Sequence, residues 1–474
     1  MHKEAFKQHG YQLIDWMADY LANTGEYPVK PNIQPGDIAK QLPAEAPTQA
    51  HQLEDIFKDF QEIILPGMTH WQHPQFFAYF PTGVSEASIF AEMLTSAMGA
   101  QCMVWATSPA AEELEERMME WLRDAMGLSK TFTGVIQDSS SSSTLVALLT
   151  ARVRQSSFKI NQRGFQRKDK YRVYTSDQAH SSVDKGVKIA GFGIGNLVKI
   201  ETNENFAMIP EALEAAILKD KAMGFTPLCV VSTIGTTSSC AIDPIAKITV
   251  ICQKYECWHH IDASYAGTAL LLPEMQWLAK EANGADSFVF NPHKWMFTNF
   301  DCSCYYVKDK SALINTFSIL PEYLKTPQDH LVNNYRDWGI PLGRRFRALK
   351  LWFVIRSMGV WGLQNKIREH IEWGQRLKEM IADTPGFEIL SPVHFNLVCF
   401  RYIPAGVTDE KAINAFNERL IKSLNQTGKI LLTQTNLKGK YTSRFVGGNI
   451  NTSWEGMMEG WKLIKSYAAD LSAL

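Results

Sequence analysis

The sequence predicts an α/β protein with a mainly parallel sheet in a large domain, a helical N-terminal segment and a small C-terminal α/β domain. From residue 171 onward, short apolar runs alternate with helical stretches, which is typical of a parallel sheet covered by helices on both faces. Residues 5–21 show the apolar period of an amphipathic helix, and after about residue 365 the pattern becomes helix, strand, helix, strand. The predicted segments are 1–85, 86–364 and 365–474.

The composition limits the classes of function. The chain has 474 residues, 45% of them hydrophobic, which is enough for two or three domains. A formal net charge of -1 gives no electrostatic reason to expect nucleic acid or an anionic membrane as a partner. No apolar run reaches the roughly 18 residues of a membrane-spanning helix, and no secretory signal is visible. The 8 cysteines are scattered, so we expect reduced cysteines in a soluble cytoplasmic protein.

The helix expected over residues 5–21 is followed by a proline-rich passage, residues 27–47, that lacks a helical period. Its apolar positions are Phe6, Leu13, Trp16, Met17, Tyr20 and Leu21. A helix set apart by such a loose segment is expected to pack against a second subunit. Packing against its own domain is the alternative.

Residues 70–82 are crowded with aromatic side chains and contain Pro74 and Pro81, so they form neither a good helix nor a regular strand. Such a stretch can line an apolar pocket that accepts an aromatic group. An irregular loop that covers the core is an equally good interpretation.

A strand, a turn and a helix are expected around a run of serines from Ser139 to Ser143. Serines at the start of a helix cap its free N–H groups, and the same N–H groups and hydroxyls can bind a phosphate. A flexible linker is disfavoured because apolar runs flank the serines on both sides. Asp138, just before the run, is expected to turn its carboxylate away from such an anion.

The strands expected in the sheet are 172–176, 197–200, 228–234, 259–262, 287–290 and 302–307. Ligands of sheets of this class bind at the carboxyl ends of the strands. Polar side chains follow three of these ends: His180 after the first, Thr236 and Thr237 after the third, and Asp262 at the end of the fourth.

Asp262 needs a cation if it lies inside a pocket, since burying an unpaired carboxylate is costly. A protonated pyridine nitrogen is such a cation, and an aspartate that caps the following turn is the alternative. A metal site built from His259, His260, Asp262 and His293 is disfavoured, because adjacent histidines on a strand point to opposite faces.

Lys294 follows the apolar strand 287–290, which Pro292 ends because proline cannot donate to a sheet ladder. A lysine just beyond a buried strand can lose its charge through desolvation, and a neutral amine can attack a carbonyl. This is typical of a Schiff-base lysine, and pyridoxal phosphate is the common cofactor bound in this way. A solvated loop lysine is the alternative, which the polar groups at the neighbouring strand ends disfavour.

A polar stretch from Lys325 to Asn334, ending at Tyr335, is a candidate lid near an active site.

Taken together, these residues resemble the aromatic L-amino-acid decarboxylases, group II pyridoxal-phosphate-dependent enzymes that act on dopa, tyrosine or tryptophan. The resemblance covers essentially the whole chain, and its most specific pieces are 70–82, 177–182, 260–267, 291–295, 299–302 and 335–347. It implies the aminotransferase-like fold type I and a homodimer whose N-terminal helices interlock.

The resemblance also implies residue roles. Lys294 binds pyridoxal 5'-phosphate covalently, Asp262 pairs with the pyridine nitrogen, and His180 stacks on the ring and contacts the substrate. Tyr335 returns a proton to Cα from the mobile loop. The residues implied for the phosphate and ring substituents are Ser140, Ser141, Thr237, Asn291 and His293. Those implied for the substrate are Thr82 near its carboxylate and Trp71, Tyr79, Phe80, Pro81 and Met103 around its side chain.

The chain departs from the family at three places. Asp138 and the serine run replace a glycine-containing motif, Ser264 replaces an alanine of animal members next to the ring, and Met103 replaces an aromatic residue. These differences leave substrate preference open. An aromatic aldehyde synthase is the alternative function; in that group the loop tyrosine is typically phenylalanine, or the stacking histidine is altered.

Overall fold

The computed structural model describes residues 2–319 and 331–473. Its contacts group the chain into two compact units: a large unit of residues 82–378 and 391–398, and a small unit of residues 1–81, 379–390 and 399–474. The three-part division predicted from the sequence stays a prediction.

Within the described residues, the large unit contains a seven-stranded sheet in the order β1-β7-β6-β5-β4-β2-β3. Its strands are β1 (Thr133–Gln137), β2 (Tyr171–Ser176), β3 (Leu197–Ile200), β4 (Thr226–Thr233), β5 (Trp258–Asp262), β6 (Ser287–Phe290) and β7 (Ser303–Val307). The pairs from β3 through β6 are parallel, and β7 runs antiparallel to both of its neighbours. The mainly parallel sheet and the six expected strands are confirmed, with small shifts at their ends.

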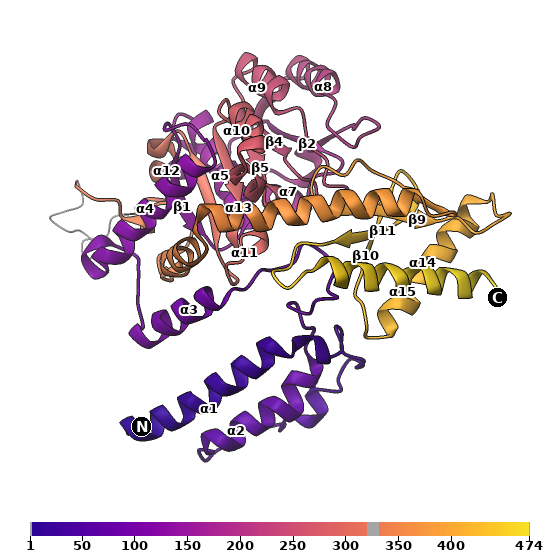
Figure 1. The fold of residues 1–474 in the computed structure, drawn as a ribbon. Coiled ribbons are helices and arrows are strands. Elements are labelled where there is room, and N and C mark those ends of the chain that lie inside the picture. The colour runs from indigo at the N-terminus through magenta and orange to yellow at the C-terminus, as the bar shows by residue number, and fades with distance from the viewer. Residues whose placement is uncertain (1, 320–330, 474) are drawn as a thin grey trace. The chain divides into compact units, whose positions relative to one another are not determined.

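Helices cover both faces of this sheet. Successive side chains of a strand point to opposite faces, so neighbouring residues of β2 pack against different helices. In β2, Val173 packs in one buried cluster with Val146 of α5 and Val183 of α7. The next residue, Tyr174, packs in a second cluster with Leu213 of α8. Figure 1 shows α8 and α9 on the side of the sheet away from α7.

The large-unit helices are α3 (Glu86–Met98), α4 (Pro109–Ala125), α5 (Ser140–Gln155), α6 (Ile160–Arg163), α7 (Ser182–Ile189), α8 (Pro210–Ala222), α9 (Ile245–Lys254), α10 (Gln276–Ala282), α11 (Pro292–Trp295) and α12 (Lys310–Phe317). α13 (Arg347–Ala382) begins in this unit and is kinked at Gly359, whose φ is 65°. Short turns of helix are η1 (Thr24–Glu26), η2 (Ala39–Gln41), η3 (Phe60–Ile64), η4 (Leu65–Gly67), η5 (Trp105–Thr107), η6 (Ile194–Asn196), η7 (Ala266–Leu271), η8 (Pro273–Met275) and η10 (Tyr335–Asp337).

The small unit is built around an antiparallel sheet, among the described residues four-stranded in the order β10-β11-β9-β8. Its elements are α1 (Lys3–Ala22), α2 (Leu53–Asp59), β8 (Phe387–Ile389), β9 (Leu397–Tyr402), α14 (Glu410–Gln426), β10 (Thr433–Leu437), β11 (Lys440–Val446) and α15 (Trp454–Ser472). The first two residues of β9 belong to the large unit.

The predicted N-terminal helix is confirmed as α1, which lies alongside α2 (Figure 1). Trp16 of α1 meets Phe57 and Phe60 edge-on, with ring centroids 5.9 and 5.3 Å apart. No residue of α1 is fully buried, and Phe6 and Tyr11 are largely exposed. Among the described helices, none combines the length and apolar character needed to cross a membrane.

Candidate active site

Lys294 lies on α11, a single helical turn that follows β6 directly. Pro292 opens this turn, where a missing N–H group costs nothing. The Lys294 N–H group donates to the carbonyl oxygen of Asn291 at 3.0 Å. Lys294 therefore lies at the edge of the sheet where the carboxyl ends of the parallel strands meet.

The next residue, Trp295, anchors this turn. Its ring is buried and stacks on Tyr265 with centroids 4.9 Å apart. Its indole N–H donates to Nδ1 of the buried His370 at 2.9 Å. Because the anchor is adjacent to Lys294, it restricts where the lysine backbone can lie.

The surroundings of Lys294 favour its neutral form. Desolvation lowers the pKa of the Lys294 amine, and the charge of Asp262 opposes this effect. The neutral amine is the form that attacks a carbonyl carbon. Asp262 ends β5 and Lys294 follows β6, the neighbouring strand, so the fold places both residues at the same edge of the sheet.

Asp262 is the buried last residue of β5 and lies between β4 and β6. Its Oδ1 accepts a hydrogen bond from the Ser264 backbone N–H at 3.0 Å and another from the Ser264 hydroxyl. The carboxylate is therefore held at the same sheet edge as Lys294.

His180 follows β2 and has a defined tautomer in its neutral form. Its Nδ1 accepts from the Ser182 N–H at 3.1 Å, so the proton of the neutral ring is on Nε2. Burial, with the charge of Lys294, lowers the pKa of the His180 imidazole, whereas Asp262 and Asp184 raise it. His180, Asp262 and Lys294 thus lie within electrostatic range of one another.

The serine run forms the start of α5, as the sequence predicts. Ser139 caps the helix by accepting from the Ser142 N–H. The buried Ser140 hydroxyl donates to Asn291 Oδ1 at 2.7 Å, which joins the start of α5 to the segment that carries Lys294. Ser141 is exposed.

Asp138 is exposed, and its Oδ1 accepts from the Ser139 N–H at 2.8 Å. Thr237 is exposed in the loop after β4, whereas the neighbouring Thr236 is buried and hydrogen-bonded to Ser239.

His293 is buried, and its Nδ1 accepts the Cys302 N–H at 2.9 Å. Burial lowers the pKa of this imidazole to about 3, so the ring is neutral at pH 7. His293 thereby links α11 to the start of β7; the implied cofactor contact stays a prediction.

The two histidines of β5 are buried and make hydrogen bonds within the core. Ser232 and Thr249 hold the two ring nitrogens of His259, at 2.7 and 3.1 Å. Nδ1 of His260 lies 2.8 Å from the Ser287 hydroxyl. In the described ranges no group of three or more potential metal ligands occurs.

Several implied substrate residues lie in the small unit. Trp71 and Tyr79 stack with centroids 5.6 Å apart, and Tyr79 is 53% exposed with a φ of 54°. The guanidinium of Arg444 lies 5.3 Å from the Phe80 ring centroid, and Pro81 is buried. The partly buried Trp71 and the exposed Tyr79 are compatible with either interpretation of residues 70–82.

Thr82 and Met103 lie in the large unit and are partly buried. Gly83, next to Thr82, donates its N–H to the His293 carbonyl oxygen at 3.1 Å. A Cβ at Gly83 would lie 2.8 Å from the Lys294 carbonyl oxygen. Because residue 83 has no side chain, the backbone next to Thr82 can pack against the backbone of Lys294.

The expected position of Tyr335 on a mobile loop stays a prediction, but the residue itself is firmly packed. Tyr335 begins η10 and is only 2% exposed. Its ring packs edge-on against Trp338, with centroids 5.0 Å apart, and the Arg344 guanidinium lies 4.9 Å from its centroid. Residues 325–330 of the expected lid lie outside the described residues, and the proton-donor role stays a prediction.

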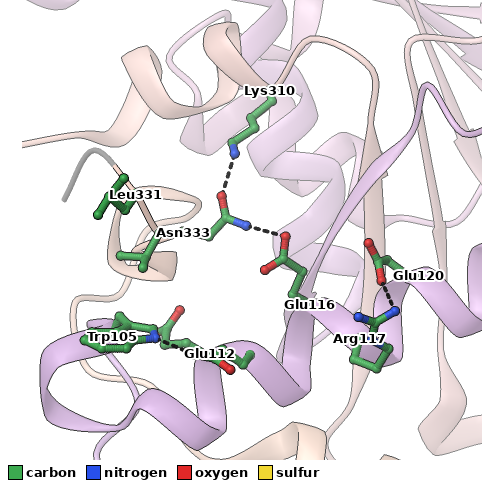
Figure 2. Close-up of a pocket in the computed structure, with 10 residues that line it drawn as sticks. Trp105, Glu112, Glu116, Arg117, Glu120, Lys310, Leu331 and Asn333 are labelled. Atoms are coloured by element: carbon green, nitrogen blue, oxygen red, sulfur yellow. Dashed lines mark hydrogen bonds and ion pairs between the residues drawn. The ribbon is translucent and has the colours of Figure 1, made fainter. Parts of the chain in front are cut away.

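Figure 2 shows a pocket of about 620 Å³ beside α4 that contains none of the predicted site residues. Four glutamates and two basic residues line it, and Asn333 links Lys310 to Glu116, with 3.0 Å between Asn333 Nδ2 and Glu116 Oε1. Burial, with the charge of Glu115, raises the pKa of Glu112 to about 8. This pocket is more polar than the apolar cavities that usually bind aromatic ligands.

Two residues at the site escaped the sequence analysis. Ser264 was noted only as a departure from the family, although a serine two residues after an aspartate commonly donates back to it. No local pattern indicates that residue 83 must be glycine. The requirement comes from close contacts with residues more than 200 positions away.

The fold and these residues fit the class of enzymes that use pyridoxal phosphate. A low-pKa amine, a buried carboxylate for a ring nitrogen and a serine-rich helix start for a phosphate fit this cofactor.

The family described as pyridoxal-dependent decarboxylase conserved domain matches residues 35–403. The chain is 42% identical to the aromatic-L-amino-acid decarboxylase of Mus musculus, covering 96% of this chain and 97% of that protein. It is 39% identical to the phenylacetaldehyde synthase of Petunia hybrida, covering 98% and 94%. The crystal structure of Oryza sativa TDC with PLP and tryptamine superposes with a TM-score of 0.96 at 32% identity, covering 100% and 99%.

The chain belongs to the pyridoxal-dependent decarboxylase family. It is a lyase of fold type I, and its cofactor is pyridoxal 5'-phosphate.

Proposed function

We propose that this enzyme removes the carboxylate of aromatic L-amino acids and releases carbon dioxide and the corresponding aryl-ethylamine. The candidate substrates are dopa, tyrosine, tryptophan, phenylalanine and 5-hydroxytryptophan. The observation that carries the proposal is the grouping of Lys294, Asp262 and His180 at one sheet edge in a member of this family. The aromatic substrate class is supported by the relatives, whose names include aromatic-L-amino-acid decarboxylase.

Bound pyridoxal phosphate supplies an electron sink for the electrons of the breaking Cα–carboxylate bond. Lys294 attaches the cofactor through its neutral amine. Asp262 holds a proton at the pyridine nitrogen, which stabilises the charge that develops on the ring. His180, with its proton on Nε2, offers a donor toward the substrate and an aromatic face toward the ring.

The phosphate is held at the start of α5 and by the loops beside it. Ser140, Ser141 and Thr237 offer hydroxyl groups, and the first turn of α5 offers N–H groups with the favourable end of the helix dipole. Asn291 orients Ser140 through their hydrogen bond, and His293 supports the adjoining backbone.

The resemblance to the family supplies the residues proposed to recognise the substrate. Thr82 binds near its carboxylate, and Trp71, Tyr79, Phe80, Pro81 and Met103 surround its side chain. An apolar environment favours loss of the charged carboxylate, since charge spreads into the cofactor as it leaves.

The return of a proton to Cα needs an acid near the substrate. Tyr335 was expected in this role, but its ring is packed in the large unit. Tyr323 lies two residues before the candidate lid, outside the described residues, and is the second candidate.

An aromatic aldehyde synthase is the second candidate function, because the chain is 39% identical to a phenylacetaldehyde synthase. In that reaction decarboxylation is followed by oxidative deamination with dioxygen. The presence of both His180 and Tyr335 favours simple decarboxylation.

The enzyme acts as a homodimer in the cytoplasm under this proposal. In the small unit, α1 leaves Phe6 and Tyr11 exposed; in the large unit, α3 leaves Phe90 and Met98 exposed. Such apolar surface is expected at a subunit interface. Light scattering should give twice the 53.6 kDa chain mass, and cell fractionation tests the location.

The proposed activity is tested by product analysis with the five aromatic amino acids side by side, measuring carbon dioxide, amine and aldehyde. We expect an amine equal in amount to the carbon dioxide from at least one substrate, and none from the Lys294→Ala variant. Aldehyde with hydrogen peroxide would support the synthase, and no product from any substrate would contradict both functions.

A further inference from the structure

Ser264 connects the side chain of Asp262 to the segment that carries Lys294. Its N–H group and its hydroxyl both donate to Oδ1 of Asp262. Its carbonyl oxygen accepts the N–H of Asn291 at 3.0 Å, and Asn291 begins the segment that carries Lys294. One residue is thus bonded to the side chain of Asp262 and to the backbone that leads to Lys294.

The double contact fixes the orientation of the Asp262 carboxylate. The last torsion of an aspartate is broad and nearly two-fold, so a carboxylate without donors samples many orientations. Here both Ser264 donors engage Oδ1, and hydrogen bonds to an ionised acceptor are stronger than those between neutral groups. The backbone of Asp262 is fixed as well, since its carbonyl oxygen accepts the Ile234 N–H at 3.0 Å.

We propose that Ser264 is a positioning residue that engages Oδ1 of Asp262 and so presents Oδ2 to the proton on the pyridine nitrogen. This inference rests on the proposed function, because it requires Asp262 to face that nitrogen. An alanine at residue 264 keeps the backbone donor and loses the hydroxyl, so Ser264 adds a second constraint that the animal enzymes of this family lack.

The test compares two cofactors on the cofactor-free enzyme. One is pyridoxal phosphate; the other is its 1-deaza analogue, in which a carbon atom replaces the ring nitrogen. Both attach to Lys294 and both carry the phosphate, but only the first has a proton for Asp262 to hold. The dissociation constant of each is measured by equilibrium dialysis for the wild type and for Ser264→Ala.

We expect Ser264→Ala to weaken pyridoxal phosphate binding roughly 10- to 150-fold, the range for one hydrogen bond to a charged group, and to leave the affinity for the deaza analogue unchanged. Ser264→Thr, which keeps the hydroxyl, should restore the wild-type ratio. Ser156→Ala is the matched control, since Ser156 is also partly buried and its hydroxyl donates to Val153 at 2.9 Å on α5.

An equal loss of affinity for both cofactors would mean that Ser264 only supports the local fold, and an unchanged affinity for both would mean that its hydroxyl does not matter; either result overturns the proposal. If Ser264→Ala does not fold, Ser264→Cys tests the same selective loss, because a thiol is a weak donor. Failure of the wild type to bind pyridoxal phosphate would instead refute the proposed function, and this inference with it.

Discussion

At the scale of single residues, Asp262 has the most specific task, because it is buried and coupled electrostatically to Lys294 and His180. Asparagine fits its space but cannot hold the pyridine nitrogen protonated. We expect Asp262→Asn to keep the fold and to lower kcat about 100-fold or more, as for loss of one electrostatic contact in a transition state.

The control is Asp309→Asn, at the cap of α12, where aspartate and asparagine cap equally well. Circular dichroism checks the fold of both variants. Near-native turnover of Asp262→Asn would show that this carboxylate does not face the ring nitrogen.

One pair of variants can show whether Tyr335 or Tyr323 donates the proton to Cα. A buried, packed Tyr335 has no need of its hydroxyl to fill space, so Tyr335→Phe should leave the ratio of amine to aldehyde unchanged. If Tyr323 supplies the proton, Tyr323→Phe should decarboxylate and release aldehyde, ammonia and hydrogen peroxide at the expense of amine.

Both products are measured from one reaction with each variant. A shift toward aldehyde in Tyr335→Phe would restore the role first predicted for that residue. An unchanged ratio in both variants would exclude both tyrosines as the proton donor.

At the scale of elements, the turns after the strands decide the site. Gly83 tests this directly, because a Cβ there would lie 2.7 Å from Phe297 Cα and 2.8 Å from the Lys294 carbonyl oxygen, both backbone atoms that cannot rotate away. Gly83→Ala should lower the free energy of unfolding by about 1–3 kcal/mol, the usual cost of overpacking, and reduce cofactor occupancy.

Gly195→Ala is its matched control in the same unit, since a Cβ there meets nothing within 4 Å. Urea unfolding gives the stability of each variant, and visible absorbance at about 420 nm gives cofactor occupancy. Equal stability of the two variants would mean that residue 83 does not need to be glycine.

The sequence predicts these elements better than their contacts. The strands and the start of α5 follow from local apolar runs and capping serines, so Lys294, Asp262 and His180 could be found as residues at strand ends. The antiparallel direction of β7 depends on long-range pairing, which no local pattern encodes. The burial of Tyr335 could not be predicted for the same reason: it comes from contacts with Trp338 and Arg344, not from the polar stretch before it.

At the scale of the whole molecule, Glu112 makes stability depend on pH. Its pKa is raised from 4.5 to about 8, mainly by burial and also by Glu115. The folded state therefore binds more protons than the unfolded state between these values, and stability falls as pH rises through this window. Glu112→Gln removes this titration, so its melting temperature should exceed that of the wild type more at pH 8 than at pH 5.

Glu113→Gln is the control for the loss of one charge from α4, because Glu113 is exposed and accepts from the Trp105 indole at 2.9 Å. Differential scanning calorimetry at both pH values compares the three proteins. A difference between Glu112→Gln and wild type that does not change with pH would contradict the raised pKa.

The central claim is that Lys294 is the lysine that binds pyridoxal phosphate. The most direct measurement is borohydride reduction of the purified holoenzyme, followed by digestion and mass spectrometric mapping of the pyridoxyl group. We expect a single labelled peptide with the label on Lys294, and loss of that label in Lys294→Ala. A pyridoxyl group on any other lysine, or none on the wild type, would contradict the account.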